Sequence, residues 1–126
     1  MAVKVVDTSA LAAVVFAEAE ETEIGDRLVG AQLAAPMLLA FEMANVCLTK
    51  LRRNPANRIA LLEAFARFLL LPIESCDIDH GAVIALAEQS GLSAYDASYL
   101  WLAYQLNAEL VTLDRQLARA ATSPHA

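Results

Sequence analysis

SAYDASYLWLAY, residues 93–104, predicts a buried helix around which the rest of the chain is arranged. Ser93 is a suitable N-cap, and neither Gly nor Pro interrupts the residues that follow it. Large apolar side chains occupy most sides of this helix, which is typical of a central helix. Asp96 lies in its first turns, with no Lys, Arg or His on a neighbouring turn. Because a buried carboxylate is costly without a partner, Asp96 either turns into water or meets a cation or a group from another segment.

The composition indicates one apolar domain. The chain has 126 residues, 58% of them hydrophobic, and a mean hydropathy of +0.46. We expect a single domain over residues 1–126, because this length suffices for one core. Charged residues interrupt every apolar run before it could cross a bilayer, and the N-terminus lacks a signal-peptide pattern. The sequence therefore predicts a cytoplasmic protein, with part of its excess apolar surface in contact with another protein chain.

The formal net charge of −6 argues against a protein that binds nucleic acid by simple electrostatic attraction. It does not exclude a nuclease, because clustered acids that hold metal ions contribute to this total. The charges are also unevenly spread along the chain. Acidic residues gather between Glu18 and Asp26, whereas basic residues gather between Lys50 and Arg58.

Strand and helix signals alternate along the chain and predict an α/β fold. Strands are expected over residues 3–6, 32–35, 69–73 and 110–113. Helices are expected over residues 10–17, 20–29, 38–53, 57–68, 80–90, 93–107 and 115–121. This order implies a sandwich of helices around a central, mostly parallel sheet.

Four acidic residues, hereafter the four acids, fall where such a fold brings separate segments together. Asp7 follows the first strand and Asp114 the last. Glu42 lies early in a helix that follows a short strand, and Asp96 lies in the first turns of the central helix. Because parallel strands place their carboxyl ends on one edge, where open α/β sheets bind ligands, we expect the four acids to converge.

Hydroxyl side chains accompany two of the four acids. Asp7 alone is also an ordinary N-cap candidate for the first helix. Both roles are compatible if Thr8 or Ser9 caps the helix while Asp7 faces a metal ion. Thr112 lies two residues before Asp114 and therefore on the same side of the predicted strand.

Four converging carboxylates require protonation or bound cations, because their charges repel. Mg²⁺ and Mn²⁺ suit oxygen ligands of this kind. Such ions support phosphodiester hydrolysis by lowering the pKa of a bound water and neutralising charge on the phosphate. In two-metal sites the two ions lie about 3.5–4 Å apart. Cys47 and Cys76 lack zinc-site spacing, and His80 is expected at the surface. No side chain therefore suggests a covalent hydrolase.

Four segments, taken in order, resemble the acidic motifs of PIN-domain ribonucleases, and most closely the toxins of VapBC toxin–antitoxin pairs. They are residues 5–11 (VVDTSAL), 41–46 (FEMANV), 95–103 (YDASYLWLA) and 111–114 (VTLD). The resemblance covers nearly the whole chain, and the third segment is the most telling. It implies a PIN-like sandwich in which Asp7, Glu42, Asp96 and Asp114 are the metal-binding catalytic acids.

The resemblance also implies an activity and partners. It implies an endoribonuclease toxin that hydrolyses RNA, often tRNA or rRNA, with Mg²⁺ or Mn²⁺ as cofactor. It implies a homodimer inhibited by a cognate VapB-type antitoxin, with Thr8, Ser9 and Thr112 supporting the acids by hydrogen bonds. Gln116 stands where some relatives carry another acid or Asn. Candidate RNA contacts, which are equally explained as ordinary solvated side chains, are Lys50, Arg52, Arg53, Arg58 and Arg115.

Three other hypotheses remain at this point. A nuclease of the same fold could process RNA without an antitoxin, and no residue separates it from a toxin. A phosphoacceptor module would use Asp7, but the sequence lacks a convincing paired acid behind the first strand and a Lys after a late strand. A non-catalytic binding module is disfavoured because acids are present at all four motifs.

Overall fold

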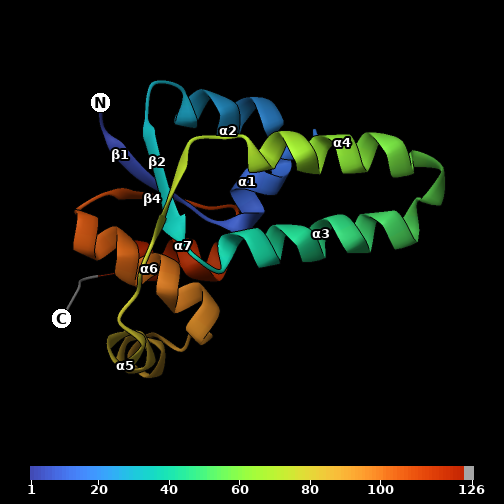
Figure 1. Cartoon of the computed structure of the whole chain (residues 1–126). Helices are drawn as coiled ribbons and strands as arrows, with labels where there is room; N and C mark the ends of the chain where they lie inside the picture. The colour runs from blue at the N-terminus through green and yellow to red at the C-terminus, as the bar shows by residue number, and fades with distance from the viewer. Residues whose placement is uncertain (124–126) are drawn as a thin grey trace.

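A sheet of four strands in the order β3-β2-β1-β4 organises the structure, a computed structural model that describes residues 1–123 (Figure 1). The strands are β1 (Val3–Val6), β2 (Gln32–Pro36), β3 (Ile73–Cys76) and β4 (Glu109–Val111). Each neighbouring pair is parallel. The predicted α/β sandwich with a mostly parallel sheet is therefore confirmed.

Helices cover the sheet on both faces. They are α1 (Thr8–Val15), α2 (Glu21–Leu28), α3 (Leu39–Arg53), α4 (Arg58–Leu69), α5 (His80–Ser90), α6 (Ala94–Leu106) and α7 (Arg115–Thr122), with a 3₁₀ turn, η1 (Pro55–Asn57), before α4. The connections through α1–α4 run toward β3, and the connection through α5 and α6 returns to β4. Because parallel crossovers are right-handed, these two groups take opposite faces. The packing agrees, since α1 contacts α2, α3 and α4, whereas α6 contacts α5, α7 and three strands.

The central helix predicted from residues 93–104 is α6. Ser93 caps it, because its Oγ accepts the backbone N–H of Asp96 at 3.1 Å. Tyr99 and Leu100 are each 1% exposed and belong to the main core. Near the start of the helix, by contrast, the large side chain of Tyr95 is 67% exposed. The helix is therefore buried on most sides, with its N-terminal turn reaching the surface.

The prediction of a strand over residues 69–73 is wrong. Helix α4 continues to Leu69, and Leu70 is 84% exposed at its C-cap. Pro72 lacks a backbone N–H and cannot donate a ladder hydrogen bond, and the strand begins after it, at Ile73. The resulting β3 is an edge strand with exposed polar residues, and the leucines before it lie at the surface.

The junctions around β1 and β4 also differ from the prediction. Helix α1 begins at Thr8 rather than residue 10, and Asp7 itself is its N-cap, so neither Thr8 nor Ser9 caps it. This follows because β1 ends at Val6, which leaves Asp7 as the single extended residue between strand and helix. Strand β4 ends at Val111, earlier than expected, and Asp114 is the N-cap of α7.

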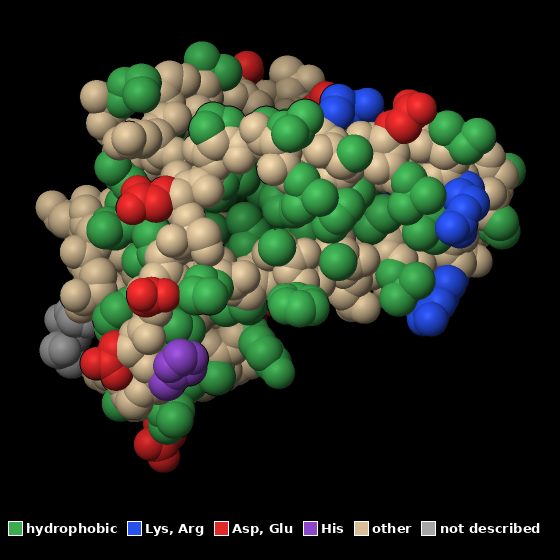
Figure 2. Space-filling view, in the orientation of Figure 1, with side chains coloured by type: hydrophobic (Ala, Val, Ile, Leu, Met, Phe, Trp, Pro, Cys, Tyr) green, Lys and Arg blue, Asp and Glu red, His purple; other side chains and the backbone are tan. Residues whose placement is uncertain are grey.

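Apolar side chains remain exposed on the face shown in Figure 2. They gather along the hairpin of α3 and α4 and beside β3, while blue Lys and Arg side chains lie toward the far end of the hairpin. Exposed apolar side chains of the two hairpin helices include Phe41 of α3 at 83% and Ile59 of α4 at 75%. No helix in residues 1–123 is long and apolar enough to cross a membrane. This surface therefore offers area for another protein chain.

Candidate active site

The four acids lie at the carboxyl edge of the sheet, around the junction of β1 and β4. The backbone N–H of Asp7 donates to the carbonyl of Val111 at 3.2 Å, which ties the ends of these strands together. The helices that follow them separate, because α1 packs with α2–α4 and α7 packs with α6. Open α/β sheets bind ligands at such a divergence of helices.

Asp7 is the most rigidly held of the four acids. Its Oδ1 accepts from Ser9 Oγ at 2.8 Å and from the backbone N–H of Ala10 at 3.1 Å. Its Oδ2 accepts from Thr112 Oγ1 at 2.6 Å. The side chain is 5% exposed, and burial raises its pKa, an effect that these hydrogen bonds partly offset and the nearby Asp114 reinforces. The structure thus places Ser9 and Thr112, both predicted supporting residues, directly against Asp7.

Glu42 lies in the first turn of α3 and is held from two other helices. Its Oε1 accepts from Thr8 Oγ1 of α1 at 2.9 Å and from Tyr99 Oη of α6 at 2.6 Å. Thr8 therefore contacts Glu42 rather than Asp7. Sequence reasoning missed Tyr99, which it counted only among the apolar residues of the central helix. Its position three residues after Asp96, on the same helical face, was the available signal.

Asp96 is held by the protein through Ser93. Ser93 Oγ accepts the backbone N–H of Asp96, and a hydrogen bond between the two side chains lowers the pKa of the Asp96 carboxyl. Burial raises its pKa first, and Asp114, Asp7 and Glu42 raise it further in that order. The four acids therefore act on one another electrostatically, as expected for convergence.

Asp114 both caps α7 and faces the other acids. Its Oδ1 accepts the backbone N–H of Leu117 at 2.9 Å, and its own N–H donates to Thr112 Oγ1 at 3.0 Å. Thr112 therefore bridges Asp7 and Asp114. Gln116, in the next turn, donates its Nε2 to the carbonyl of Gly91 at 3.3 Å and so contacts the α5–α6 loop.

No basic side chain of the described residues forms an ion pair with this cluster. Among residues 1–123 the ion pairs join Lys4 and Arg27 to Glu109, and Lys50 to Glu18, so none includes the four acids. The main interactions that raise the pKa of Asp96 likewise come from burial and acids alone. The negative charge is therefore left for a cation or a proton to compensate.

The donors fit a hard divalent cation. The cluster supplies carboxylate and hydroxyl oxygens without His or Cys, which suits Mg²⁺ or Mn²⁺. As the side chains stand, no three His, Cys, Asp or Glu residues in the described chain are grouped closely enough to hold one ion. A shared ion would therefore require side-chain movement. Asp96 is better able to move than Asp7, because its carboxylate has one hydrogen bond to lose, from Ser93, against three at Asp7.

The candidate RNA-binding residues lie at different distances from the cluster. Arg115 opens α7 directly after Asp114 and is exposed. Arg52 and Arg53 end α3, at the turn of the hairpin in Figure 1, about 15 Å along the helix from Glu42 at 1.5 Å per residue. Lys50 pairs with Glu18 at 2.6 Å, and Arg58 begins α4. Only Arg115 is therefore adjacent in sequence to one of the four acids.

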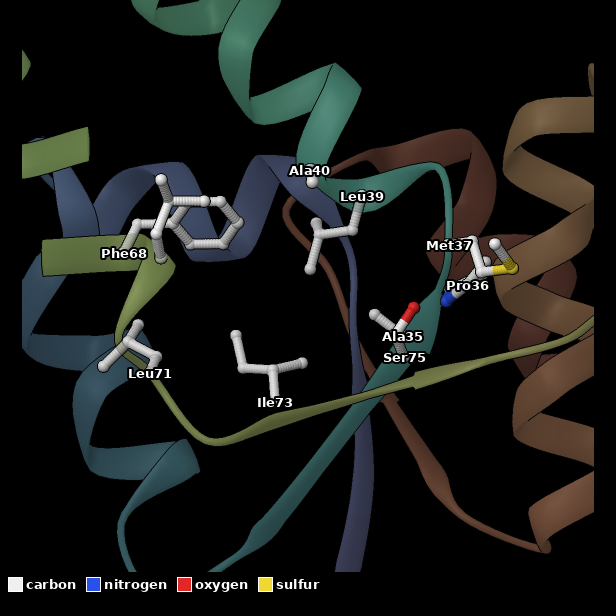
Figure 3. Close-up of a pocket in the computed structure, with 10 residues that line it drawn as sticks. Ala35, Pro36, Met37, Leu39, Ala40, Phe68, Leu71, Ile73 and Ser75 are labelled. Atoms are coloured by element: carbon white, nitrogen blue, oxygen red, sulfur yellow. The ribbon is translucent and has the colours of Figure 1, made fainter. Parts of the chain in front are cut away.

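Two hollows lie near this edge of the sheet. The larger, hereafter the apolar groove, has a volume of about 840 Å³ and is lined by Met37, Leu38, Phe41, Ile78, Val83, Ile84, Tyr95 and neighbouring residues. Phe41 and Tyr95 each precede an acid in sequence. The smaller hollow, about 160 Å³, lies where Leu39, Phe68, Leu71 and Ile73 point toward one another (Figure 3). None of the four acids lines either hollow, and the apolar groove is related to them through Phe41 and Tyr95, their neighbours in sequence.

Asp96→Asn is expected to raise the Tm of the metal-free protein by a few degrees at pH 7.5. The folded state raises the pKa of Asp96 above its ordinary 3.8, so ionisation destabilises the fold as pH rises through that raised value. Solvent screening and the favourable pull of the helix N-terminus keep the gain small. Thermal unfolding in chelator at pH 7.5 and pH 4 checks this. The gain should shrink at pH 4, and a lower Tm for the variant at pH 7.5 would contradict it.

Comparisons with known proteins agree with this architecture. A model of the PIN domain matches residues 4–122. Ribonuclease VapC3 of Pyrobaculum aerophilum is 36% identical over 121 residues, which span 90% of this chain and 91% of that protein. The crystal structure of PAE2754 from Pyrobaculum aerophilum has a TM-score of 0.77 at 26% identity, covering 96% of this chain and 81% of that one.

A second solved structure extends the likeness in fold. It is Mycobacterium tuberculosis VapC20, described as a Sarcin-Ricin loop cleaving toxin. Its TM-score is 0.67 at 16% identity, over 96% of this chain and 99% of that chain. At this identity the likeness concerns the arrangement of helices and strands alone.

Proposed function

We propose, from the premise that the chain belongs to the PIN-domain family and to its VapC-type ribonucleases, that it is a toxin that hydrolyses RNA with a divalent cation. The observation that carries this proposal is the uncompensated cluster of four acids. Three of them raise the pKa of the fourth, and no ion pair of the described residues reaches them. The proposed cofactor is Mg²⁺ or Mn²⁺.

Two of the acids, Asp7 and Glu42, are held in place by hydrogen bonds, whereas Asp96 can move. Asp7 is held by the hydroxyl groups of Ser9 and Thr112, and Glu42 by those of Thr8 and Tyr99. Asp114 Oδ1 caps α7, and its Oδ2 has no hydrogen-bond partner among the described residues. Asp96 can turn to complete the ligand set. A cation bound among them would lower the pKa of an attacking water and neutralise charge on the phosphodiester. With no Cys or His in the cluster, the acids themselves are the available acceptors for the proton of that water.

A protein partner is the second part of the proposal. The apolar groove is lined by Phe41 and Tyr95, which precede two of the acids in sequence, and Phe41 is 83% exposed. Exposed apolar surface of this kind marks protein interfaces. It supports both a homodimer and a VapB-type antitoxin whose segment covers the site, and the name of the VapC3 relative supports the latter. We propose a cytoplasmic setting for this pair.

Cleavage of a total tRNA and rRNA pool by the purified, antitoxin-free protein tests the function. With Mn²⁺ or Mg²⁺ we expect discrete cuts that chelator abolishes. Asp96→Asn should reduce the cutting rate by at least about 100-fold, the upper range for losing even an outer-sphere partner of a metal. Glu21→Gln removes an equal charge from the exposed start of α2 and should cut like wild type.

Two results would count against the proposal. Equal cutting by wild type and Asp96→Asn would remove Asp96 from the site and point to a contaminating nuclease. No cutting of either RNA pool by folded, metal-loaded protein would contradict the tRNA or rRNA substrate. Inhibition by the product of a small neighbouring gene, added to active protein, would support the antitoxin part, and unaffected cutting would oppose it.

A further inference from the structure

Tyr99 reaches from the buried face of α6 to Glu42 on α3. Its ring is 1% exposed, and its Oη donates to Glu42 Oε1 at 2.6 Å, across 57 residues of sequence. This is a short hydrogen bond to a carboxylate, the stronger class of hydrogen bond in proteins. Burial and this bond raise the pKa of Tyr99, so the phenol stays protonated and remains a donor through the neutral range.

Proton accounting fixes the direction of the bonds at Glu42. Thr8 Oγ1 also lies 2.9 Å from Glu42 Oε1, and it lies 3.1 Å from Tyr99 Oη. Each hydroxyl has a single proton to donate. Because an ionised carboxylate is a better acceptor than a hydroxyl, both protons point to Oε1. The 3.1 Å contact between the two hydroxyl oxygens is then the weakest of the three interactions.

The two donors leave the carboxylate of Glu42 asymmetric. Oε1 accepts both hydrogen bonds, whereas Oε2 has no hydrogen-bond partner within residues 1–123. Glu42 is also close enough to Asp96 to raise its pKa. Oε2 is therefore the oxygen of Glu42 that remains available to a ligand shared with the other acids.

We propose that Tyr99 is a positioning residue that holds Glu42 so that it binds the cation through Oε2 alone. This inference rests on the metal-dependent function proposed above. Tyr99 is not itself a ligand, because its hydroxyl proton is donated to Glu42 Oε1. It acts through Glu42, as outer partners of metal-binding carboxylates do, and such partners typically account for 10–100-fold in metal affinity.

The test measures Mn²⁺ affinity directly, from the paramagnetic resonance signal of free Mn²⁺ during titration of the protein. Tyr99→Phe removes the hydroxyl and keeps the ring, and should weaken Mn²⁺ binding about 10-fold. Tyr104→Phe makes the same change further along α6, and should bind like wild type. Thermal unfolding in chelator verifies that each variant is folded.

A double-mutant cycle separates positioning from a general structural role. In a Glu42→Ala background the hydroxyl has no carboxylate to hold, so adding Tyr99→Phe should change the Mn²⁺ affinity less than about twofold. An equal loss in both backgrounds would overturn the inference, and so would wild-type affinity in Tyr99→Phe. If the wild-type chain itself bound no Mn²⁺, both the proposed metal-dependent function and the inference about Tyr99 would be contradicted.

Discussion

Asp7→Ala is expected to abolish RNA cleavage and also to lower the free energy of unfolding by about 2–4 kcal/mol. Asp7 is both the N-cap of α1 and the acceptor for Ser9 and Thr112, at 5% exposure. Truncation removes the cap and leaves these buried donors without an acceptor. Cleavage should fall by more than about 100-fold, because a ligand and not merely its support is lost.

Asp7→Asn separates the two roles. Asn is as good an N-cap as Asp, and its Oδ1 can still accept from Ser9 and Ala10. We therefore expect near-complete recovery of stability without recovery of cleavage. Urea unfolding and the RNA assay, run on both variants, check this.

Asp79→Ala is the matched control for Asp7→Ala. Asp79 caps α5 by accepting from Ala82 at 3.0 Å, but it is exposed and lies outside the four acids. It should lose only about 1 kcal/mol and should cleave normally. If Asp7→Ala proved no less stable than Asp79→Ala, the hydrogen bonds around Asp7 would not matter as described. Cleavage by Asp7→Asn at the wild-type rate would remove it from the ligand set.

The position of the acids was predictable because it depends on topology. A residue that follows a parallel strand lies at the carboxyl edge whatever the details of packing, and this locates Asp7 and Asp114. Glu42 and Asp96 lie in first helical turns, which start at the same edge. The sequence could not reveal how each acid is held. Asp7, Thr8 and Ser9 are three successive capping residues, and only the observed backbone decides that Asp7 is the cap.

The errors arise where the outcome depends on long-range packing. The apolar run ending at Ile73 is indistinguishable from a buried strand by periodicity. It divides into a helix end, an exposed turn and a strand because α4 extends to Leu69 and Pro72 delays the sheet. Tyr99 was read as a core aromatic, and its ring is one. Its position three residues after Asp96 indicates only that it shares the helical face of that acid. Its partner, Glu42, is 57 residues away, so the local sequence does not identify the pair.

Mn²⁺ at about 100 times its dissociation constant is expected to stabilise the wild-type fold by about 2.7 kcal/mol, or on the order of 10 °C in Tm. The gain arises because the unfolded chain does not gather the four acids. The variant Asp96→Asn with Asp114→Asn should gain little, since it lacks two of the carboxylates. Asn at position 114 retains a capping oxygen for α7, so the fold itself should persist. Thermal unfolding across a Mn²⁺ titration at constant ionic strength provides the measurement.

The decisive feature of this experiment is that the order of the two unfolding temperatures, of wild type and of the double variant, should reverse between chelator and Mn²⁺. In chelator the double variant should unfold at a slightly higher temperature than wild type, because it lacks both the partly buried charge at position 96 and its repulsion by Asp114, which together raise the pKa of Asp96. In saturating Mn²⁺ it should unfold at a lower temperature, because the cation stabilises only the intact cluster. A variant with Glu21→Gln and Glu23→Gln removes the same charge from the exposed first turn of α2 and should follow wild type in both conditions. Equal stabilisation of all three proteins would mean that Mn²⁺ screens the net charge of −6 rather than binding among the four acids.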